Sequence, residues 1–313
     1  MKNKLSDIQK LWARKLMENK ILKADGNAYE DLFLEIARAK NPNIKGVKPR
    51  GQLGDRKNDG FDSQNGIYYQ VYAPEAPDQS FGSAITKAKK DFEGLYDYWN
   101  TIAPIKEYYF VFNDKFKGTH PDLEKVLAEI KSDYSLEYTG SYLSPDLLDD
   151  FLSLSTHEIA SMFGLLPTST KIGTLDYEII DEVISYIIEF EEETPFGELK
   201  IPDPDFEKKI MHNSLSDDIR KMLDRGGDNL GALEDYFLKY GKGVKEDLAK
   251  KLNKKYKSIR DSLYEEHGII DTDLVFVLLY ESIIKRKTNG HYTAVFAILY
   301  YYFETCDIFE EPK

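Results

Sequence analysis

The dipeptide Asn65-Gly66 constrains the fold of this chain more than any other short feature. Asn-Gly is the strongest short-range signal for a β-hairpin, because both residues readily adopt the positive φ angles of a tight turn. The run that follows it, residues 67–73, is apolar and aromatic, which is the composition of a strand. We therefore predict a hairpin over residues 59–73, ended by Pro74 and Pro77.

Helical and β-rich segments alternate around this hairpin. Apolar residues at helical spacing predict helices over residues 5–22, 28–40, 81–100 and 119–132. Residues 41–54 are punctuated by Pro and Gly and predict a loop. A β-rich run predicts a buried central strand over residues 107–113, and a short strand is expected at 135–138. This order predicts an α/β domain, residues 1–165, in which helices flank a mixed sheet.

The second half of the chain has a different pattern. Two short helices are expected at residues 144–153 and 155–164, and a linker at 166–170. Beyond it, helical spacing predicts helices over residues 176–190, 204–213, 215–225, 229–240, 243–267, 272–287 and 291–304. Residues 175–313 are thus predicted to form an all-α domain. Its last helix is apolar nearly all round, which indicates a position inside the bundle or in a partner interface.

Composition excludes several classes of protein. The single cysteine, Cys306, rules out a disulfide framework and a cysteine-rich zinc site. No apolar run approaches the roughly 20 residues that a bilayer span needs, and the N-terminus lacks the apolar core of a signal peptide. We therefore expect a cytoplasmic protein with no membrane segment. There is no phosphate-binding loop, and the five histidines show no metal-ligand spacing.

Charge is distributed unevenly along the chain. The net charge is −13, which on its own argues against binding nucleic acid. Residues 1–57, however, carry 14 Lys and Arg against 7 Asp and Glu, whereas residues 151–313 carry 20 against 31. The acidity belongs to the predicted all-α domain. The basic N-terminal segment suits phosphate binding, although a solvated helix face would have the same composition.

Carboxylates crowd the Gly-rich turn before the hairpin. Asp55, Asp59 and Asp62 fall within eight residues, and the following strand carries an amide, Gln70. This pattern resembles the metal site of divergent restriction-endonuclease-like nucleases, the PD-(D/E)xK class. Phosphodiester hydrolysis needs charge neutralisation and an activated water, which one or two Mg²⁺ (or Mn²⁺) ions supply from oxygen ligands. Asp59 and Gln70 are the first candidate ligands and Asp62 the next, while Asp55 is expected to order the turn. Asp residues also favour turns in their own right.

Three further residues complete the candidate site. The nuclease class places a lysine two positions after the Glu or Gln, but here Tyr72 occupies that place, on the same strand face as Gln70. Either Lys87 of the next helix replaces the missing cation, or Tyr72 orients the substrate and catalysis is slow or absent. Glu30, early in the second helix, is a third candidate carboxylate. The alternatives are a buried Gln70 amide satisfied by backbone, a solvated Lys87 and a Glu30 that complements the helix dipole.

A family resemblance rests on residues Gly54–Glu75, in particular Asn58-Asp59-Gly60 and the strand segment Tyr69–Pro74. This stretch resembles effector and accessory proteins of bacterial ABC-three-component conflict systems, which are relatives of the Lamassu anti-phage systems. The resemblance extends through Lys87 and Asp91-Phe92 to residues 109–114. It appears again at residues 306–310, so it touches both predicted domains.

The resemblance implies a function and partners. Such proteins are encoded with an SMC/Rad50-like ABC ATPase and a small middle component, and their N-terminal domain is usually a restriction-endonuclease-like nuclease. It therefore implies a Mg²⁺-dependent DNA endonuclease with Asp59 and Gln70 in the active site and with residues 175–313 docking on the ATPase complex. Homo-oligomerisation on activation is expected, because cutting both strands needs two active sites. The alternative is a catalytically inactive adaptor that binds the ATPase or nucleic acid without cleaving. A third hypothesis is a nuclease that acts on RNA or on a small nucleotide.

Overall fold

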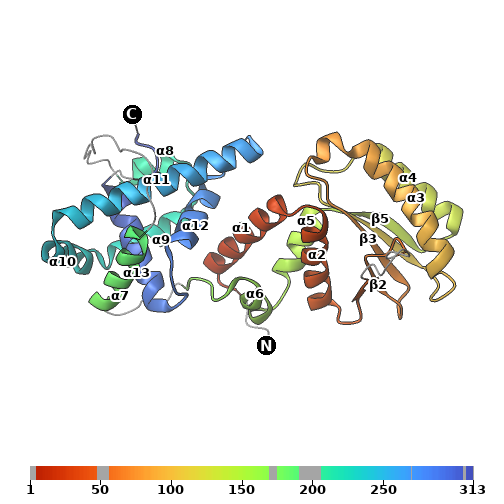
Figure 1. The fold of residues 1–313 in the computed structure, drawn as a ribbon, viewed down its shortest axis with the longest axis horizontal. Helices are drawn as coiled ribbons and strands as arrows, with labels where there is room; N and C mark the ends of the chain where they lie inside the picture. The colour runs from red at the N-terminus through yellow and green to blue at the C-terminus, as the bar shows by residue number, and fades with distance from the viewer. Residues whose placement is uncertain are drawn as a thin grey trace. The chain divides into compact units, whose positions relative to one another are not determined.

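The computed structural model describes residues 5–47, 56–168, 175–189, 206–268, 270–305 and 308–312. The chain forms two compact units (Figure 1). Residues 17–159 form one, here called the α/β unit, and residues 1–16 with 160–313 form the other, here called the helical unit. Two of the sequence features named above, Asp55 and Cys306, lie outside the described residues.

The α/β unit is built on a five-stranded mixed sheet whose strand order follows the sequence. The strands are β1 (Lys45–Gly46), β2 (Gly60–Asp62), β3 (Ile67–Tyr72), β4 (Glu107–Phe112) and β5 (Tyr138–Tyr142). The first three are antiparallel neighbours, and β4 and β5 continue the sheet in parallel. The predicted hairpin is confirmed as β2–β3, in which Phe61 lies opposite Tyr68.

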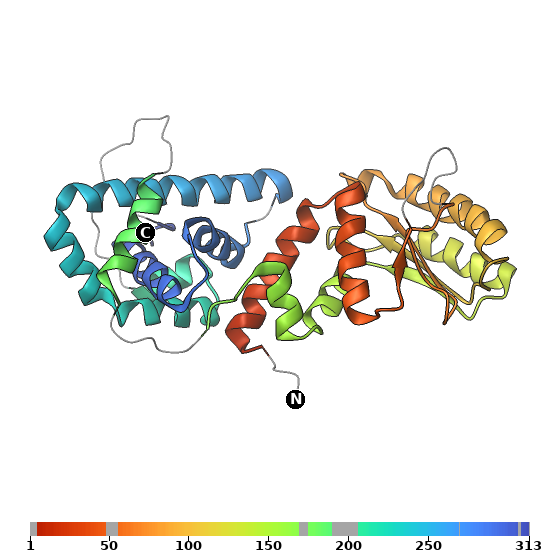
Figure 2. The same ribbon diagram turned by 60° about the horizontal axis from the view of Figure 1, so that its bottom comes forward.

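Helices cover both faces of this sheet (Figure 2). On one face, α3 (Phe81–Trp99) and α4 (Pro121–Tyr134) bury a core that includes Tyr68, Tyr108 and Phe92. On the other, α2 (Gly26–Lys40) packs beside α5 (Ser144–Leu152), and its Phe33 ring contacts Tyr69. Because side chains alternate along a strand, Tyr68, Gln70 and Tyr72 point to the α3 face and Tyr69 and Val71 to the α2 face.

Three local features differ from the prediction. The strand expected at residues 135–138 begins at Tyr138, because α4 continues to Tyr134 and Ser135 ends it in a left-handed conformation, with φ at 54°. The segment expected to be loop contains the two-residue strand β1. A 3₁₀ turn, Pro77–Gln79, lies between β3 and α3. The mixed sheet flanked by helices is otherwise as predicted.

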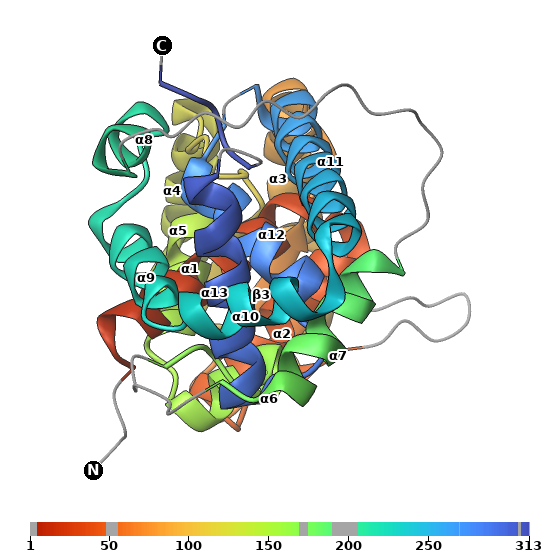
Figure 3. The same cartoon turned by 90° about the vertical axis from the view of Figure 1, so that its left-hand side faces the viewer.

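Helices are the regular secondary structure of the helical unit in its described residues. They are the first part of α1 (Asp7–Lys23), the C-terminal part of α6 (Thr156–Phe163), α7 (Tyr177–Ile188), α8 (Phe206–His212), α9 (Asp217–Gly227), α10 (Leu230–Tyr240), α11 (Lys242–His267), α12 (Thr272–Ile283) and α13 (Asn289–Glu304). Several of these helices begin after a residue whose side chain accepts a hydrogen bond from a backbone N–H of the first turn, for example Ser216 before α9 and Thr288 before α13. The apolar α13 is buried among α7, α9, α10 and α12 (Figure 3). Gly226 of α9 allows this packing, because a Cβ there would collide with the Phe296 carbonyl oxygen.

The division between the units falls within α1 (Asp7–Lys23), after Leu16. The prediction placed residues 1–165 in one domain, whereas the structure groups residues 1–16 with the C-terminal helices. Trp12 explains the grouping. Its fully buried ring makes edge contacts with Phe276 and Tyr280, and its Nε1 donates to the Glu281 carboxylate at 2.8 Å. Within the described residues, no helix combines the length and apolar character needed to span a bilayer.

Candidate functional site

The carboxylate of Asp59 lies beside the amide of Gln70. Gln70 Nε2 donates to Asp59 Oδ2 at 2.6 Å, and the Val71 backbone N–H donates to the same oxygen, also at 2.6 Å. The exposed fractions of the two side chains are only 5% and 3%. The hairpin register produces this contact, because Gly60 pairs with Tyr69 and so brings the residue before β2 against the middle of β3. The two residues that the sequence singled out first are therefore brought together.

Several buried polar atoms near this pair have no hydrogen-bond partner within the described part of the chain. On the α3 face of the sheet they are Gln70 Oε1 and the hydroxyl of Tyr108 on the neighbouring strand, and both side-chain polar atoms of Asn58, the residue before Asp59, are in the same state. Burial raises the pKa of Tyr108, and the negative charges of Asp91 and Asp59 act in the same direction. A buried polar atom without a partner costs about 1–3 kcal/mol. The α3 face of the sheet thus combines two carboxylates with two oxygens that lack donors.

A second group of charges lies on α3. The nearly buried carboxylate of Asp91 binds Lys57 Nζ at 2.8 Å and Lys87 Nζ at 2.5 Å. Burial alone would raise the pKa of Asp91, but the bonds from the two lysines outweigh it and lower that pKa. A pocket of about 480 Å³ opens here, lined by Lys57, Gly82, Ser83, Thr86, Lys87, Lys90 and Asp91. Lys87, the predicted cation, is therefore joined by a second lysine, Lys57, which the sequence did not indicate.

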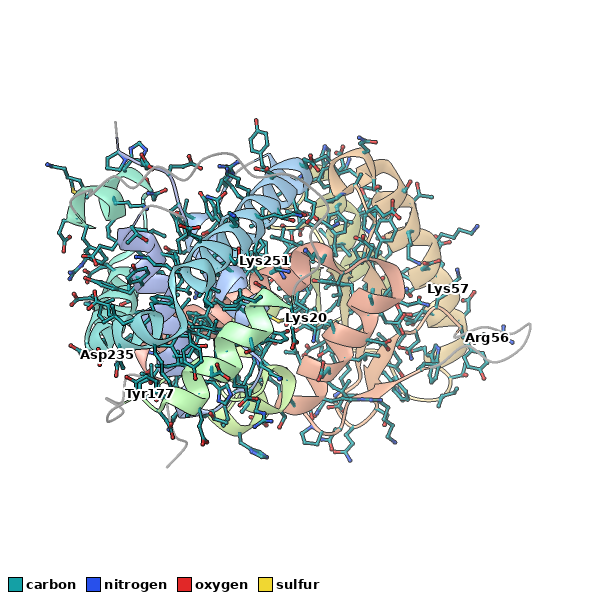
Figure 4. The ribbon with its side chains drawn as sticks, turned by 60° about the vertical axis from the view of Figure 1, so that its left-hand side comes forward. Lys20, Arg56, Lys57, Tyr177, Asp235 and Lys251 are labelled. Atoms are coloured by element: carbon teal, nitrogen blue, oxygen red, sulfur yellow. The ribbon has the colours of Figure 1, made fainter. Side chains whose placement is uncertain are left out.

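The turn that carries Lys57 is strained. Arg56 and Lys57 are consecutive non-glycine residues with φ at 57° and 65°, a conformation that costs roughly 1–2 kcal/mol per residue. Both side chains rest on α3 (Figure 4): the Arg56 guanidinium lies 4.9 Å from the centre of the Tyr98 ring, and Lys57 binds Asp91. Contacts with α3 therefore hold the turn that leads directly into Asp59.

Tyr72 lies on the same strand face as Gln70, as the alternation predicts. Its half-buried ring stacks on Phe112 at 6.0 Å between centroids and also contacts Phe110. The position that would carry a lysine in the nuclease class is thus the edge of an aromatic core. Tyr72 brings no positive charge to the site.

Asp62 is held by partners other than Asp59 and Gln70, and the role of Glu30 stays a prediction. Asp62 is wholly buried, and its carboxylate accepts four hydrogen bonds from residues of the hairpin loop and of the segment after α2. The donors are Gln64 N at 2.9 Å, Asn65 N at 3.3 Å, Asn65 Nδ2 at 2.8 Å and Asn41 Nδ2 at 2.9 Å. Burial would raise the pKa of Asp62, but these bonds outweigh it and the pKa is lowered. Glu30 belongs to α2, which covers the sheet face opposite to Gln70.

Sequence reasoning did not assign a role to Lys57, Asp91 or Tyr108. One signal was available: Lys87 and Asp91 are four residues apart on a helix, where opposite charges meet. Lys57 stands two residues before Asp59, but its pairing with α3 depends on the fold. No group of three His, Cys, Asp or Glu side chains that could hold a metal ion occurs among the residues that the structure describes.

Comparison with protein-family models gives a match in the C-terminal half of the chain. Residues 178–310 match the family model of C-terminal domain 10 of the ABC-three component (ABC-3C) systems. The matched segment runs from α7 past the end of α13 and lies within the helical unit. No curated protein and no solved structure matches the chain. Residues 178–310 are thus similar to a C-terminal domain of ABC-three-component systems, and the match supports membership of the chain in such a system.

Proposed function

We propose that the α/β unit is a restriction-endonuclease-like, Mg²⁺-dependent DNA nuclease that acts as the effector of an ABC-three-component anti-phage system. One observation carries this proposal: the Asp59 carboxylate and the Gln70 amide converge at the start of the hairpin, beside a pocket lined by three lysines. The element order supports it as well, since an antiparallel hairpin followed by a helix and a parallel strand is the arrangement that this nuclease class uses.

The donor set supports a magnesium ion once the Gln70 amide is turned over, because in the structure Gln70 Nε2, not Oε1, faces the Asp59 carboxylate. Gln70 Oε1 is a buried acceptor without a donor among the described residues, and it belongs to the side chain that contacts the Asp59 carboxylate. Carboxylate and amide oxygens are ligands that Mg²⁺ prefers, and the ion usually keeps several waters and needs only one or two carboxylates. Asp59 and Gln70 would hold it. When bound, the ion would neutralise phosphate charge and activate the attacking water.

A second candidate function is that of a catalytically inactive adaptor. Tyr72 favours it, because an aromatic ring stacked on Phe112 replaces the lysine of the nuclease class. The small exposed fractions of Asp59 and Gln70 favour it too. Such a subunit would bind the ATPase or nucleic acid through the same surfaces without cleaving.

Cleavage of plasmid DNA by the purified full chain separates the two functions. With Mg²⁺ or Mn²⁺, we expect nicking or linearisation that Asp59→Asn abolishes, since the amide keeps the size of the side chain but loses the charge. Asp97→Asn is the matched control, because Asp97 is exposed and does not line the pocket, and it should cleave like the parent. An Asp59→Asn protein that cuts normally would show that the site is misassigned. Absence of cleavage under every metal and partner condition would favour the adaptor.

The partner proposal concerns the helical unit. A C-terminal domain of a multi-component system implies partner proteins, and we propose that residues 175–313 dock on an SMC/Rad50-like ABC ATPase together with a small middle component. Activation would bring two copies of the α/β unit together, since cutting both strands needs two sites. Co-purification of the full chain with the two co-encoded proteins tests the docking, and failure of all three to associate would contradict it.

A further inference from the structure

The pocket on α3 has the chemistry of a phosphate site. Its lining includes three ammonium groups, from Lys57, Lys87 and Lys90, and two hydroxyl groups, from Ser83 and Thr86. A single carboxylate, Asp91, opposes them, so the lining is net positive in a protein of net charge −13. Lysine binds phosphate as a point charge, and the Ser83 hydroxyl can donate to a phosphate oxygen, whereas the Thr86 hydroxyl already donates to the Gly82 carbonyl oxygen at 2.9 Å.

Asp91 holds two of these lysines in place. Its carboxylate is 5% exposed, whereas the Lys57 and Lys87 side chains are 48% and 31% exposed, so the carboxylate faces inward and the lysines reach solvent. Long lysine side chains otherwise lose considerable rotamer entropy when they bind a ligand. A buried carboxylate that fixes both ammonium groups beforehand lowers that cost.

The strained turn connects this pocket to the Asp59–Gln70 pair. Residues held in sparsely populated backbone conformations cluster at functional sites, where surrounding contacts enforce them. Here Asp91 and Tyr98 of α3 hold Lys57 and Arg56 in left-handed conformations, two residues before Asp59. The same turn therefore positions a lysine of the pocket and the carboxylate of the candidate site.

We propose that this pocket binds a phosphate of the DNA backbone, that Lys57 and Lys87 contact the phosphate, and that Asp91 is the positioning residue for both. The inference rests on the proposed function, whose substrate it places relative to Asp59. In this arrangement Lys57 of the turn before the hairpin and Lys87 of α3 provide the positive charge that Tyr72 does not.

Binding of a fluorescein-labelled 20-base-pair duplex to the full chain, measured by anisotropy in EDTA over a range of salt concentrations, tests the proposal. Lys57→Gln and Lys87→Gln should each lower the slope of log K against log salt by about 0.9, which corresponds to roughly 8-fold weaker binding at 0.1 M salt. Lys106→Gln is the matched control, because Lys106 is exposed and does not line the pocket. It should leave the affinity and the slope unchanged.

Asp91→Asn distinguishes a positioning role of Asp91 from a simple effect of its charge. Removing a negative charge should tighten DNA binding, whereas loss of a positioning residue should weaken it by roughly 8-fold, as one lost phosphate contact does. Asp97→Asn removes the same charge from an exposed position of α3 and should not weaken binding. Asp91→Glu should restore part of the affinity. Urea unfolding of each variant confirms that the α/β unit is folded.

The outcomes separate this inference from the nuclease proposal. Unchanged binding by Lys57→Gln and Lys87→Gln, or tighter binding by Asp91→Asn, would overturn the phosphate site even if the chain cleaves DNA. Pocket-dependent binding by a chain that never cleaves would support the phosphate site while the nuclease proposal fails. Preference for an RNA duplex of the same sequence would overturn the assignment to DNA.

Discussion

Asp62 offers a sharp test of how the hairpin is held, because the structure gives it a role other than the metal ligand that the sequence suggested. Its Oδ1 accepts two backbone N–H groups and its Oδ2 accepts two side-chain amides. In Asp62→Ala all four donors lose their acceptor. In Asp62→Asn, one oxygen becomes an NH₂ group that faces two donors, so this nearly isosteric change should be almost as damaging.

The magnitude follows from where the donors lie. Gln64 and Asn65 are exposed, so water can replace the carboxylate at their backbone N–H groups at little cost. Asn65 Nδ2 belongs to one of these exposed residues, so the larger loss is the bond from the half-buried Asn41, at about 1.5–3 kcal/mol for a hydrogen bond to a charged group. We expect Asp62→Ala to reduce the free energy of unfolding of the α/β unit by about 2–3 kcal/mol. With a urea m-value of about 2 kcal/mol/M, the midpoint should fall by roughly 1–1.5 M.

Tryptophan fluorescence can report this change on one unit at a time. The chain has two tryptophans, Trp12 in the helical unit and Trp99 in the α/β unit. In a Trp12→Phe background, Trp99 is the only tryptophan, so selective excitation of tryptophan reports on the α/β unit. The Trp99 ring lies 4.9 Å from the ring of Phe61, the neighbour of Asp62 on β2. If Asp62→Ala leaves the Trp99 midpoint unchanged but abolishes metal-dependent cleavage, Asp62 belongs to the catalytic site and our reasoning about the turn is refuted.

Three further predictions concern stability. The lowered pKa of Asp91 means that its contribution is present above pH 4 and is lost as the pH falls through its folded-state value. The unfolding free energies of the parent and of Asp91→Asn should therefore converge below about pH 4; a gap that is constant from pH 6 to 3 would contradict this. Asn113→Ala removes three buried hydrogen bonds that link the end of β4 to the end of α1 and the start of α5, and a fourth, local bond from the Lys115 backbone. This substitution should lower the free energy of unfolding of the α/β unit by about 3 kcal/mol, measured by Trp99 fluorescence in urea. An unchanged unfolding midpoint would contradict the prediction. Trp12→Ala should reduce the free energy of unfolding of the helical unit by about 3–5 kcal/mol. Loss of helix in urea, measured by circular dichroism at 222 nm, should show this change, while the midpoint of the Trp99 fluorescence transition should not move.

Local signals predicted much of the α/β unit. The Asn-Gly turn and the alternation of the following strand were sufficient to predict the antiparallel hairpin, and the ladder geometry then brings residue 59 against residue 70. The helices were predictable because apolar residues recur at helical spacing. The ends of the helices were harder to predict: α4 continues to Tyr134 before Ser135 ends it in a left-handed conformation, so the following strand begins later than predicted.

What could not be predicted depends on contacts between distant segments. Asp62 binds Asn41, which lies 21 residues away, so its role as an anchor of the loop is invisible in the local pattern. The pairing of Lys57 with Asp91 requires α3 to pack over the turn before β2. Trp12 has the spacing of an ordinary amphipathic helix, and only the fold shows that its partners are near the other end of the chain.

The position of Trp12 has a consequence for synthesis on the ribosome. Its hydrogen-bond acceptor, Glu281, is 269 residues further along the chain, so at translation rates of about 5–20 residues per second the indole waits roughly 15–50 s for its partner. Residues 17–159 are complete long before that and can close without it. The first turns of α1 are therefore among the last parts of the protein to find their native neighbours, and until then they present an apolar segment to which chaperones can bind.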